Sequence, residues 1–573
     1  MNDSNREQKG TYMMKPTDKT SDAPMVDLTR RNVLFAGAAS FALASLSSLG
    51  VPEHAYAAEP AAKPTGQAIL GFSQEVTVLH PLMTANEVDQ GVWWNLFSPL
   101  WMIDADGVFV PVLAKAVPTL ENGGISADGL TWRVELRRDV KWHDGKPMTA
   151  GDVAYSINLM KNPAFRARNR TAFELITSVA VEGDNIITWK LKEPYAPLAS
   201  ALSWTFIVPA HVLSQYPDPN SPQFAAAPVG TGPFRFVSRQ AGDHMILEAN
   251  PNYFGKAPSL NRLIFKYVPD LNAMYTQFKT GELDFIGLQG IPANFYKEAT
   301  ALKGRQVYPA NRGAVENLTL NLAHPALGDK AVRKALNVAI DRQSICDLVY
   351  YGVPKPAHNY LVPTHWAYNA NLPKPEYDPK KAATMLDQAG WVRGADGIRA
   401  KNGVRLSFTC STVTGNQLRA QTQQLIADDF KKIGVEMLIK NLVAAVLWAD
   451  FWRNSEFDSL MTAPTYTIAS DPDVTHRFGG GAIPKQSGSG SNVSQYKNEG
   501  VDALLARGRQ EYDIGKRKEI YAKVQELIMD DLPFLPLFYE VQIEGTKAGL
   551  EGYANNVNVL ANSWNAASWR WKA

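Results

Sequence analysis

Two kinds of hydrophobic pattern alternate along most of this chain. Residues 130–136 alternate apolar with other side chains, 68–72 are a short apolar run with a β-branched centre, and 185–191 contain three β-branched residues, so all three predict strands. Apolar residues fall on one stripe in 329–350 and in 415–434, which predicts amphipathic helices. Because strands alternate with helices and no repeat is present, we expect a mixed α/β fold with at least two lobes. The length of 573 residues is enough for three to four domains.

Start and stop residues mark further elements. Thr149–Asp152 resembles a capping box, and Asp378-Pro379 with Gly390 brackets another helix at both ends. Residues 520–528 carry an apolar stripe before Pro533, and 435–439 predict a strand. The Gly/Ser-rich segment 479–491 predicts a mobile surface loop.

The chain has only two cysteines, which exclude a disulfide-rich scaffold and a four-cysteine zinc site. Cys346 falls in a helical pattern and Cys410 in a strand pattern, so we expect buried structural thiols. A disulfide between them is left open, because an oxidising compartment would permit it.

The charge balance excludes several classes of partner. The 58 Lys and Arg residues against 56 Asp and Glu residues give a formal net charge of +2. Neither nucleic acid nor an acidic membrane surface is therefore an expected partner. No stretch after the leader approaches 18 uninterrupted apolar residues, so we expect a mature chain that does not span a membrane.

The first 57 residues have the pattern of an export signal. Arg30 and Arg31 precede a weakly apolar Ala/Ser-rich run, and Ala55-Tyr56-Ala57 matches the small-x-small pattern of a cleavage site. Paired arginines indicate a twin-arginine (Tat) signal, cleaved before Ala58. An uncleaved membrane anchor is the alternative, which the short, interrupted run disfavours. No cysteine lies near Ala57, so we expect a periplasmic protein without a lipid anchor.

Catalytic motifs are nearly absent. Residues 124–129 have the glycine spacing of a phosphate-binding loop, but Leu130 and Thr131 replace the Lys and Ser/Thr that bind phosphate. The zinc-protease, nucleophile-elbow and Cys-x-x-Cys motifs do not occur, and no two histidines have helical i,i+4 spacing. We therefore expect no enzyme, no cofactor and no metal centre, although a histidine site assembled from distant segments stays open.

Several non-catalytic segments occur in a characteristic order. They combine turn glycines, helix caps and core stripes: Trp132–Gly145, Thr149–Ser156, Val229–Phe234, Asn250–Gly255, Gly281–Asp284 and Asp329–Arg342. Together they closely resemble the extracellular solute-binding proteins of dipeptide, oligopeptide and nickel ABC importers, known as family 5. The resemblance extends over nearly all of the chain after Ala58.

The resemblance implies a bilobed clamp of the type II-like periplasmic-binding-protein kind, which closes about a hinge on a small solute. The first lobe would comprise 58–102, 228–327 and 540–573, with an extra subdomain at 103–227 and a second lobe at 328–539. Implied partners are a peptide or other small ligand and the membrane permease subunits of an ABC importer. We expect the protein to act as a monomer.

The resemblance also implies where ligand would bind. Two extended segments face ligand in family members, which correspond here to Gln74 and Glu75 after the first strand and to Tyr466, Thr467 and Asp471 before an Asp-Pro turn. Peptide binders commonly hold the ligand's ammonium with an Asp about three residues before that turn, where this chain has Ile468. A buried ammonium without a carboxylate partner is costly, which counts against ligands held by an α-amino group.

Three further residues are candidate ligand contacts. Trp94 and Trp448 could line a cleft, because flat apolar rings stack on sugars or peptide side chains. Arg419, on the helix bracketed by glycines, could bind a ligand carboxylate through two hydrogen bonds. A short peptide is the first ligand expectation, and an oligosaccharide or opine-like sugar conjugate, a nickel chelate or haem are the alternatives. A secreted hydrolase on the same fold is the rival class, and a carboxylate pair or Ser/His pair in the cleft would mark it.

Overall fold

The computed structural model describes residues 64–83, 86–465, 471–559 and 561–572. The signal residues Arg30, Arg31 and Ala57 lie outside these ranges, as do Tyr466 and Thr467. No helix within the described ranges has the length and apolar character needed to cross a bilayer.

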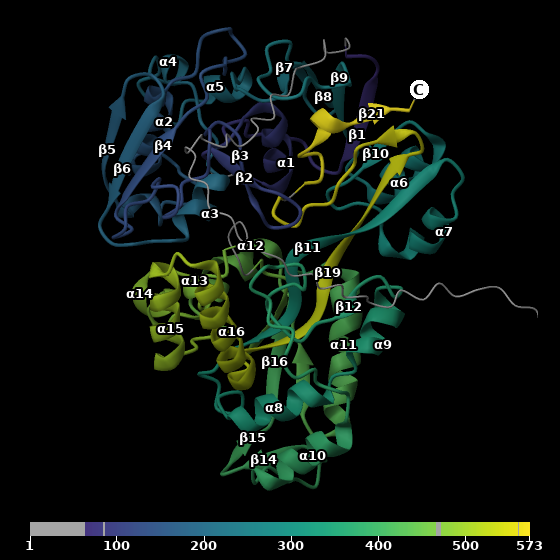
Figure 1. The fold of residues 1–573 in the computed structure, drawn as a ribbon. Helices are drawn as coiled ribbons and strands as arrows, with labels where there is room; N and C mark the ends of the chain where they lie inside the picture. Colours follow the sequence, from purple (N-terminus) through teal and green to yellow (C-terminus); the bar gives the residue numbers. More distant parts are fainter. Residues whose placement is uncertain (1–63, 84–85, 466–470, 560, 573) are drawn as a thin grey trace, which may run out of the picture. The chain divides into compact units, whose positions relative to one another are not determined.

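One eleven-stranded sheet runs through the described chain (Figure 1). Two long antiparallel strands lie at its centre, β11 (Arg305–Leu320) and β19 (Phe534–Lys547). On one side follow β10 (Phe285–Ile286), β1 (Gln67–Phe72), β9 (Arg262–Tyr267), β8 (His244–Ala249) and β7 (Phe234–Gln240). On the other side follow β18 (Ser459–Thr462), β16 (Ser407–Ser411) and β17 (Glu436–Ile439), while β12 (Lys355–Pro356) pairs with β19.

The first core packs against the β1 side of this sheet. β1 pairs in parallel with β9 and β10, and its Leu70 and Phe72 are fully buried against helix α1 (Glu87–Leu96). The far C-terminal segment returns to the same core through Trp569. Helices α6 (Leu271–Thr280) and α7 (Tyr296–Thr300) belong to a separate cluster that includes Ile543.

The range predicted as an extra subdomain contains a three-stranded sheet, whose Trp132 and Trp189 rings stack and belong to the first core. Its capping box forms as expected, because Asp152 accepts from the backbone of Thr149. Its elements are β2 (Trp101–Ile103), β3 (Phe109–Pro111), β4 (Thr131–Glu135), α2 (Ala150–Lys161), β5 (Ile176–Glu182), β6 (Ile186–Leu191), α3 (Leu198–Ser203), α4 (Ala210–Leu213) and α5 (Pro222–Ala226).

Two further cores lie around the other ends of β11 and β19. One contains Leu318, Phe408 and Phe430 and is covered by α8 (Lys330–Ala339), α10 (Pro379–Gln388) and α11 (Gln417–Lys432). The other contains Tyr521 and Phe534 and is covered by α15 (Glu499–Gln510) and α16 (Ile514–Asp531). Smaller elements here are the strands β13 (Val392–Arg393), β14 (Arg399–Lys401) and β15 (Val404–Arg405), and the helices α12 (Ala444–Val446), α13 (Thr475–Phe478) and α14 (Pro484–Ser487).

β11 and β19 are the connection between the first core and the later ones. Their pairing is interrupted where residues 312–314 of β11 form a bulge opposite Glu540 of β19. After the bulge, the chain enters the two further cores: Val315 packs in the core of Tyr521, and Leu318 and Leu320 pack in the core of Phe408. All three residues fall in the range expected for the first lobe. A bulge bends a strand and increases its twist, so we expect the hinge of the clamp at this position and refer to it below as the hinge.

Two local expectations are wrong. The helix expected over 329–350 breaks at Ile340, because Asp341 starts a new helix by accepting from the backbone of Ser344. The buried Arg342 side chain then donates to the carbonyl of Pro536 on β19 and holds the break in place. The segment 479–491, expected to be a mobile surface loop, instead contains short helical turns, including α14, and buries Ile483 and Pro484. Cys346 and Cys410 are buried as expected, and both are free thiols.

Candidate functional site

The segment after β1 is held in place by its own lobe. The backbone N–H groups of Thr77 and Val78 donate to the buried Asp89 carboxylate of α1 at 2.6 and 2.9 Å. The Ser73 hydroxyl donates to the side-chain oxygen of Gln289. Hydrogen bonds therefore attach the chain that follows β1 to helix α1.

The two predicted contacts in this segment differ in their surroundings. Gln74 is exposed. Glu75 is half-buried and accepts from the backbone N–H of Gly242 at 3.0 Å, with Arg239 at 3.7 Å. Its carboxylate therefore has partners on the β7–β8 hairpin.

The second predicted segment is described only at its ends. Ala314, in the β11 bulge, forms a bridge with Thr465. At the other end, both carboxylate oxygens of Asp471 lie 3.0 Å from a terminal nitrogen of Arg517, and both side chains are buried. Asp471 also accepts from the backbone of Asp473, which is the Asx turn typical of Asp before Pro. The charge of Asp471 is thus already paired.

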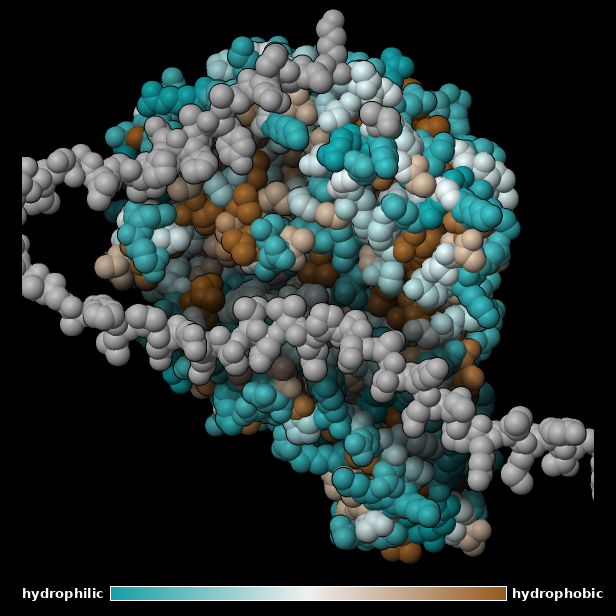
Figure 2. Space-filling model, turned by 45° about the vertical axis from the view of Figure 1, so that its right-hand side comes forward, coloured by the Kyte–Doolittle hydropathy of each residue, from teal (hydrophilic) through white to brown (hydrophobic). Residues whose placement is uncertain are grey.

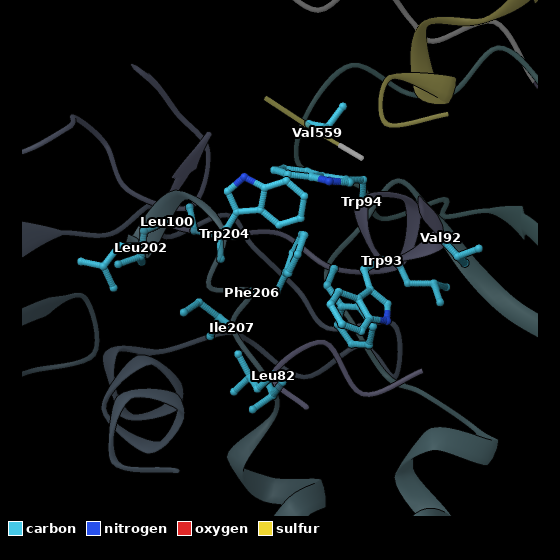
Figure 3. Packing of buried hydrophobic residues seen from close by; sticks show 14 of the residues in the cluster. Leu82, Val92, Trp93, Trp94, Leu100, Leu202, Trp204, Phe206, Ile207 and Val559 are labelled. Carbon is cyan, nitrogen blue, oxygen red and sulfur yellow. The ribbon is translucent and has the colours of Figure 1, made fainter. Parts of the chain in front are cut away.

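Trp94 lies in an aromatic cluster with Trp204 and Phe206. Its ring meets the Trp204 and Phe206 rings edge-on, at centroid distances of 5.5 and 4.9 Å, and Val559 lies above it (Figure 3). Only 7% of Trp94 is exposed, so it offers little free face for stacking a sugar ring. Its indole Nε1 has no hydrogen-bond partner among the described residues, whereas that of Trp204 donates to the carbonyl of Asn558.

Arg168 adds a positive charge to this cluster. Its guanidinium carbon lies 5.1 Å from the Trp204 ring centre and 5.9 Å from that of Trp93. Its two long-range hydrogen bonds go to neutral oxygens, the Trp204 carbonyl and the Gln90 side chain. Within the described part of the chain no carboxylate forms an ion pair with it, and loss of hydration lowers the pKa of Arg168 to about 10. Arg168 is half-buried, so part of its guanidinium stays accessible to an anionic group.

Helix α1 presents one face to this region. Glu87, Gln90 and Trp94 are spaced three and four residues apart, so they lie on the same side of the helix. Glu87 pairs with Arg312 of the β11 bulge at 2.7 Å. Burial disfavours the charged form of Arg312, but the carboxylates of Glu87, Glu540 and Glu544 outweigh it and raise its pKa. One helix face thus contacts the hinge at one end and the aromatic cluster at the other.

A small cavity of about 30 Å³ lies at the hinge itself, with room for about one water molecule. Its polar lining includes Arg312 and the fully buried Glu544, which accepts from Gln542, Tyr553 and Asn562. Thr465 and Val559 complete its wall, so the cavity lies between the hinge, the second predicted segment and the aromatic cluster.

Arg419 already has a partner in the structure. Its guanidinium binds the buried Glu316 carboxylate through two hydrogen bonds of 2.8 and 2.9 Å. Against the effect of burial, this carboxylate raises the pKa of Arg419. The bidentate geometry predicted for a ligand carboxylate is therefore formed with an internal one.

Trp448 is 47% exposed in a π-helical turn, η4 (Leu447–Phe451). It is one of a run of exposed apolar side chains that includes Leu438, Val443 and Val446. Its role in ligand contact stays a prediction. Hydrophilic residues cover most of the face drawn in Figure 2, and hydrophobic ones gather in separate patches, including one in a hollow of its upper half.

The family expectation was tested by comparison with known proteins. The model of the bacterial extracellular solute-binding proteins, family 5, matches residues 108–486. The chain belongs to this family. The bilobed clamp is the fold of the family, so the predicted fold class is confirmed.

Known relatives extend the match over most of the chain. The oligopeptide-binding protein AppA of Bacillus subtilis is 29% identical over 496 residues, which cover 85% of this chain and 89% of AppA. The structure of B. subtilis AppA with a nonapeptide aligns at a TM-score of 0.72 and 28% identity, over 89% of this chain and 100% of that one. NikZ from Campylobacter jejuni, in complex with Ni(L-His), aligns at 0.74 and 27% identity, over 88% of this chain and 99% of NikZ. AppA is named an oligopeptide-binding protein, and NikZ was solved with a nickel chelate.

Arg168 and Arg312 were not predicted from the sequence as candidate site residues. Arg168 lies in the run Arg166-Ala-Arg-Asn-Arg170, where nothing marks one arginine over its neighbours. Its desolvation depends on indoles supplied by distant parts of the chain. Arg312 beside Gly313 in a strand pattern was a weak signal of a bulge.

Proposed function

We propose that this protein is the exported, periplasmic solute-binding component of an ABC importer and that it captures a small solute through a carboxylate group, most simply a short peptide. The observation that carries the ligand class is Arg168, a half-buried guanidinium that packs against two indoles and has no carboxylate ion pair in the described chain. Similarity to AppA, named an oligopeptide-binding protein, supports the peptide assignment.

A ligand carboxylate would supply the negative charge that Arg168 lacks among the described residues. Arginine presents donors in a planar fork that matches a carboxylate, and such charge-assisted hydrogen bonds are the stronger ones in proteins. An anion beside Arg168 would replace the hydration that burial removes. Trp94 Nε1, also without a partner among the described residues, offers a second donor in the same cluster.

Binding of a peptide through its ammonium end has less support. Ile468 replaces the Asp expected to hold an ammonium, and the nearby Asp471 is paired with Arg517. We therefore propose that the carboxylate end, and not the ammonium end, anchors the ligand.

Calorimetric titration with trialanine and with trialanine amide tests this assignment. We expect trialanine to bind and the amide, which lacks the carboxylate, to bind at least tenfold more weakly. The variant Arg168→Gln should lose about tenfold to hundredfold in trialanine affinity, because a hydrogen bond to a charged group is worth about 1.5–3 kcal/mol. Arg138→Gln is the matched control, since Arg138 is an exposed arginine of the same subdomain. Equal affinity for both peptides, or an unchanged Arg168→Gln variant, would contradict the proposal.

A metal chelate is the second candidate. NikZ was solved with Ni(L-His), a chelate whose amino acid carries a carboxylate. The described residues contain no group of three His, Cys, Asp or Glu side chains that could hold a metal ion, so a metal would have to arrive with its own ligands. Titration with Ni²⁺ and L-histidine together, with each alone as a control, separates this candidate from the peptide.

One pair of carboxylates in the structure bears on the alternative that the protein is a secreted hydrolase. Glu316 and Glu540 form a neighbouring carboxylate pair, but Glu316 is engaged by Arg419. We expect mass spectrometry to recover trialanine intact after prolonged incubation, whereas release of alanine would indicate turnover.

A further inference from the structure

The turn between α15 and α16 makes direct contact with the extra subdomain. The Tyr512 hydroxyl donates to the carbonyl of Gly129 at 3.0 Å and accepts from the backbone N–H of Tyr195 at 3.2 Å. The neighbouring carbonyl of Arg509 accepts from the backbone N–H of Ala196 at 2.7 Å. Three hydrogen bonds therefore join two regions that are more than 300 residues apart in the sequence.

The surface opposite Tyr512 is shaped to receive it. Gly129 has a φ of +71°, and a Cβ at this position would lie 2.6 Å from the Tyr512 ring. The Tyr512 ring also contacts that of Trp132 at a centroid distance of 6.1 Å. The glycine spacing of residues 124–129, which resembles a phosphate-binding loop, thus has a different use, because its last glycine leaves room for an aromatic side chain.

A second contact joins the same two regions. The Ser200 hydroxyl of α3 lies 3.4 Å from Asp471, whose carboxylate is held by Arg517 of α16. This contact involves different residues on both sides and borders the predicted ligand segment. Both contacts bridge the first lobe's subdomain and the second lobe, away from the hinge in β11 and β19.

We propose that Tyr512 and Gly129 form a latch that holds the extra subdomain against the second lobe and so favours the closed clamp. Hydrogen bonds that exist in only one of two conformations shift the equilibrium toward it. Loss of the Tyr512 hydroxyl removes two of these hydrogen bonds, so the closed-to-open ratio should fall about fivefold to hundredfold. The proposed latch does not depend on the identity of the solute. Experiments that contradict the latch would therefore leave the proposed function unaffected.

The test compares Tyr512→Phe with Gly129→Ala, which fills the space of the ring instead of removing the hydroxyl. Tyr308→Phe is the matched control, because its hydroxyl contacts Gln306 within the first lobe. Hydrogen exchange is followed in two places, at residues 192–199 beside the latch and at 471–487 in the second lobe. Small-angle scattering of the ligand-free protein reports the radius of gyration, and a melting curve confirms that each variant is folded.

The latch predicts faster exchange at both places and a larger radius of gyration for both variants, with neither change in Tyr308→Phe. Faster exchange in residues 192–199 alone, with an unchanged radius of gyration, would show that the contact is only local and would overturn the proposal. Unchanged exchange at both places would overturn it as well.

Discussion

Glu540 lies at the β11 bulge, opposite the interrupted pairing and among charges from three elements. Arg312 and Glu316 come from β11, Arg419 from α11, and Glu87 from α1. Burial, and then the negative charge of Glu316, raise the pKa of Glu540 to about 7. The hinge thus contains a carboxyl group that changes charge near neutral pH.

This shift predicts how stability depends on pH. The ordinary glutamate value is 4.5, so the folded state binds the proton of Glu540 more tightly than the unfolded state does. The resulting stability is fully present below pH 4.5 and is lost as pH rises through about 7. Glu540→Gln, which mimics the neutral form, should match the wild type at pH 4.5 and exceed it at pH 8 by about 1–2 kcal/mol.

Chemical denaturation of both proteins at the two pH values provides the measurement. The exposed Glu182→Gln serves as the control and should show no such difference. A Glu540→Gln variant that is less stable than the wild type at pH 8 would show that the charged form is the one the hinge favours.

Single residues also show where prediction from sequence stops. Asp471 and Arg419 are charged side chains in suitable positions, and both are paired internally with residues distant in sequence. Arg168 looked like its neighbours in the sequence, and what distinguishes it is its packing against the rings of Trp93 and Trp204. Whether a charge is free depends on tertiary contacts, and the pattern of residue types along the chain does not contain them.

At the scale of elements, α1 and the segment after β1 act as one unit. Asp89 is buried, and three backbone N–H groups donate to it, those of Thr77, Val78 and Asn86. The helix thereby sets the path of the chain at the sheet edge where Gln74 and Glu75 lie.

Asp89→Asn should weaken this unit. An amide nitrogen cannot accept from the Asn86 N–H group, and the remaining bonds lose their charge assistance, so we expect a cost of about 1.5–3 kcal/mol. The melting temperature should fall and hydrogen exchange in residues 73–80 should accelerate. Asp106→Asn, at an exposed turn, is the control. Unaltered exchange in 73–80 would show that other contacts hold the segment.

Most elements could be predicted, because caps and periodicity act locally. The capping box of α2 and the Asp378-Pro379 start of α10 are found where the residues indicate them. The break at Ile340 could not be predicted in this way, because it is held by Arg342 reaching a carbonyl on β19. The bulge in β11 likewise becomes visible only through its pairing with β19.

At the scale of the whole molecule, the ordered motifs were the most informative part of the sequence. They predicted the family and the clamp, which the comparisons confirm. They are scaffold residues, however, so they say little about the ligand. The lobe boundaries and the predicted ligand contacts stay predictions.

Export can be tested on the whole molecule. Replacing Arg30 and Arg31 by lysines should leave the protein in the cytoplasm, because the paired arginines are the feature that indicates the Tat route. Fractionation of cells carrying the wild type and the variant measures this. The variant reaching the periplasm in normal amounts would exclude the Tat assignment, and N-terminal sequencing of the exported wild type would test cleavage before Ala58.

The most direct test of solute capture is mass spectrometry of small molecules released by denaturing the protein purified from its native periplasm. A clamp that buries its ligand should release one compound close to one equivalent, and our account predicts that it carries a free carboxylate, as a short peptide does. The Arg168→Gln protein, prepared in the same way, should release much less of it. Release of a neutral saccharide at one equivalent, or equal retention by Arg168→Gln, would contradict the account.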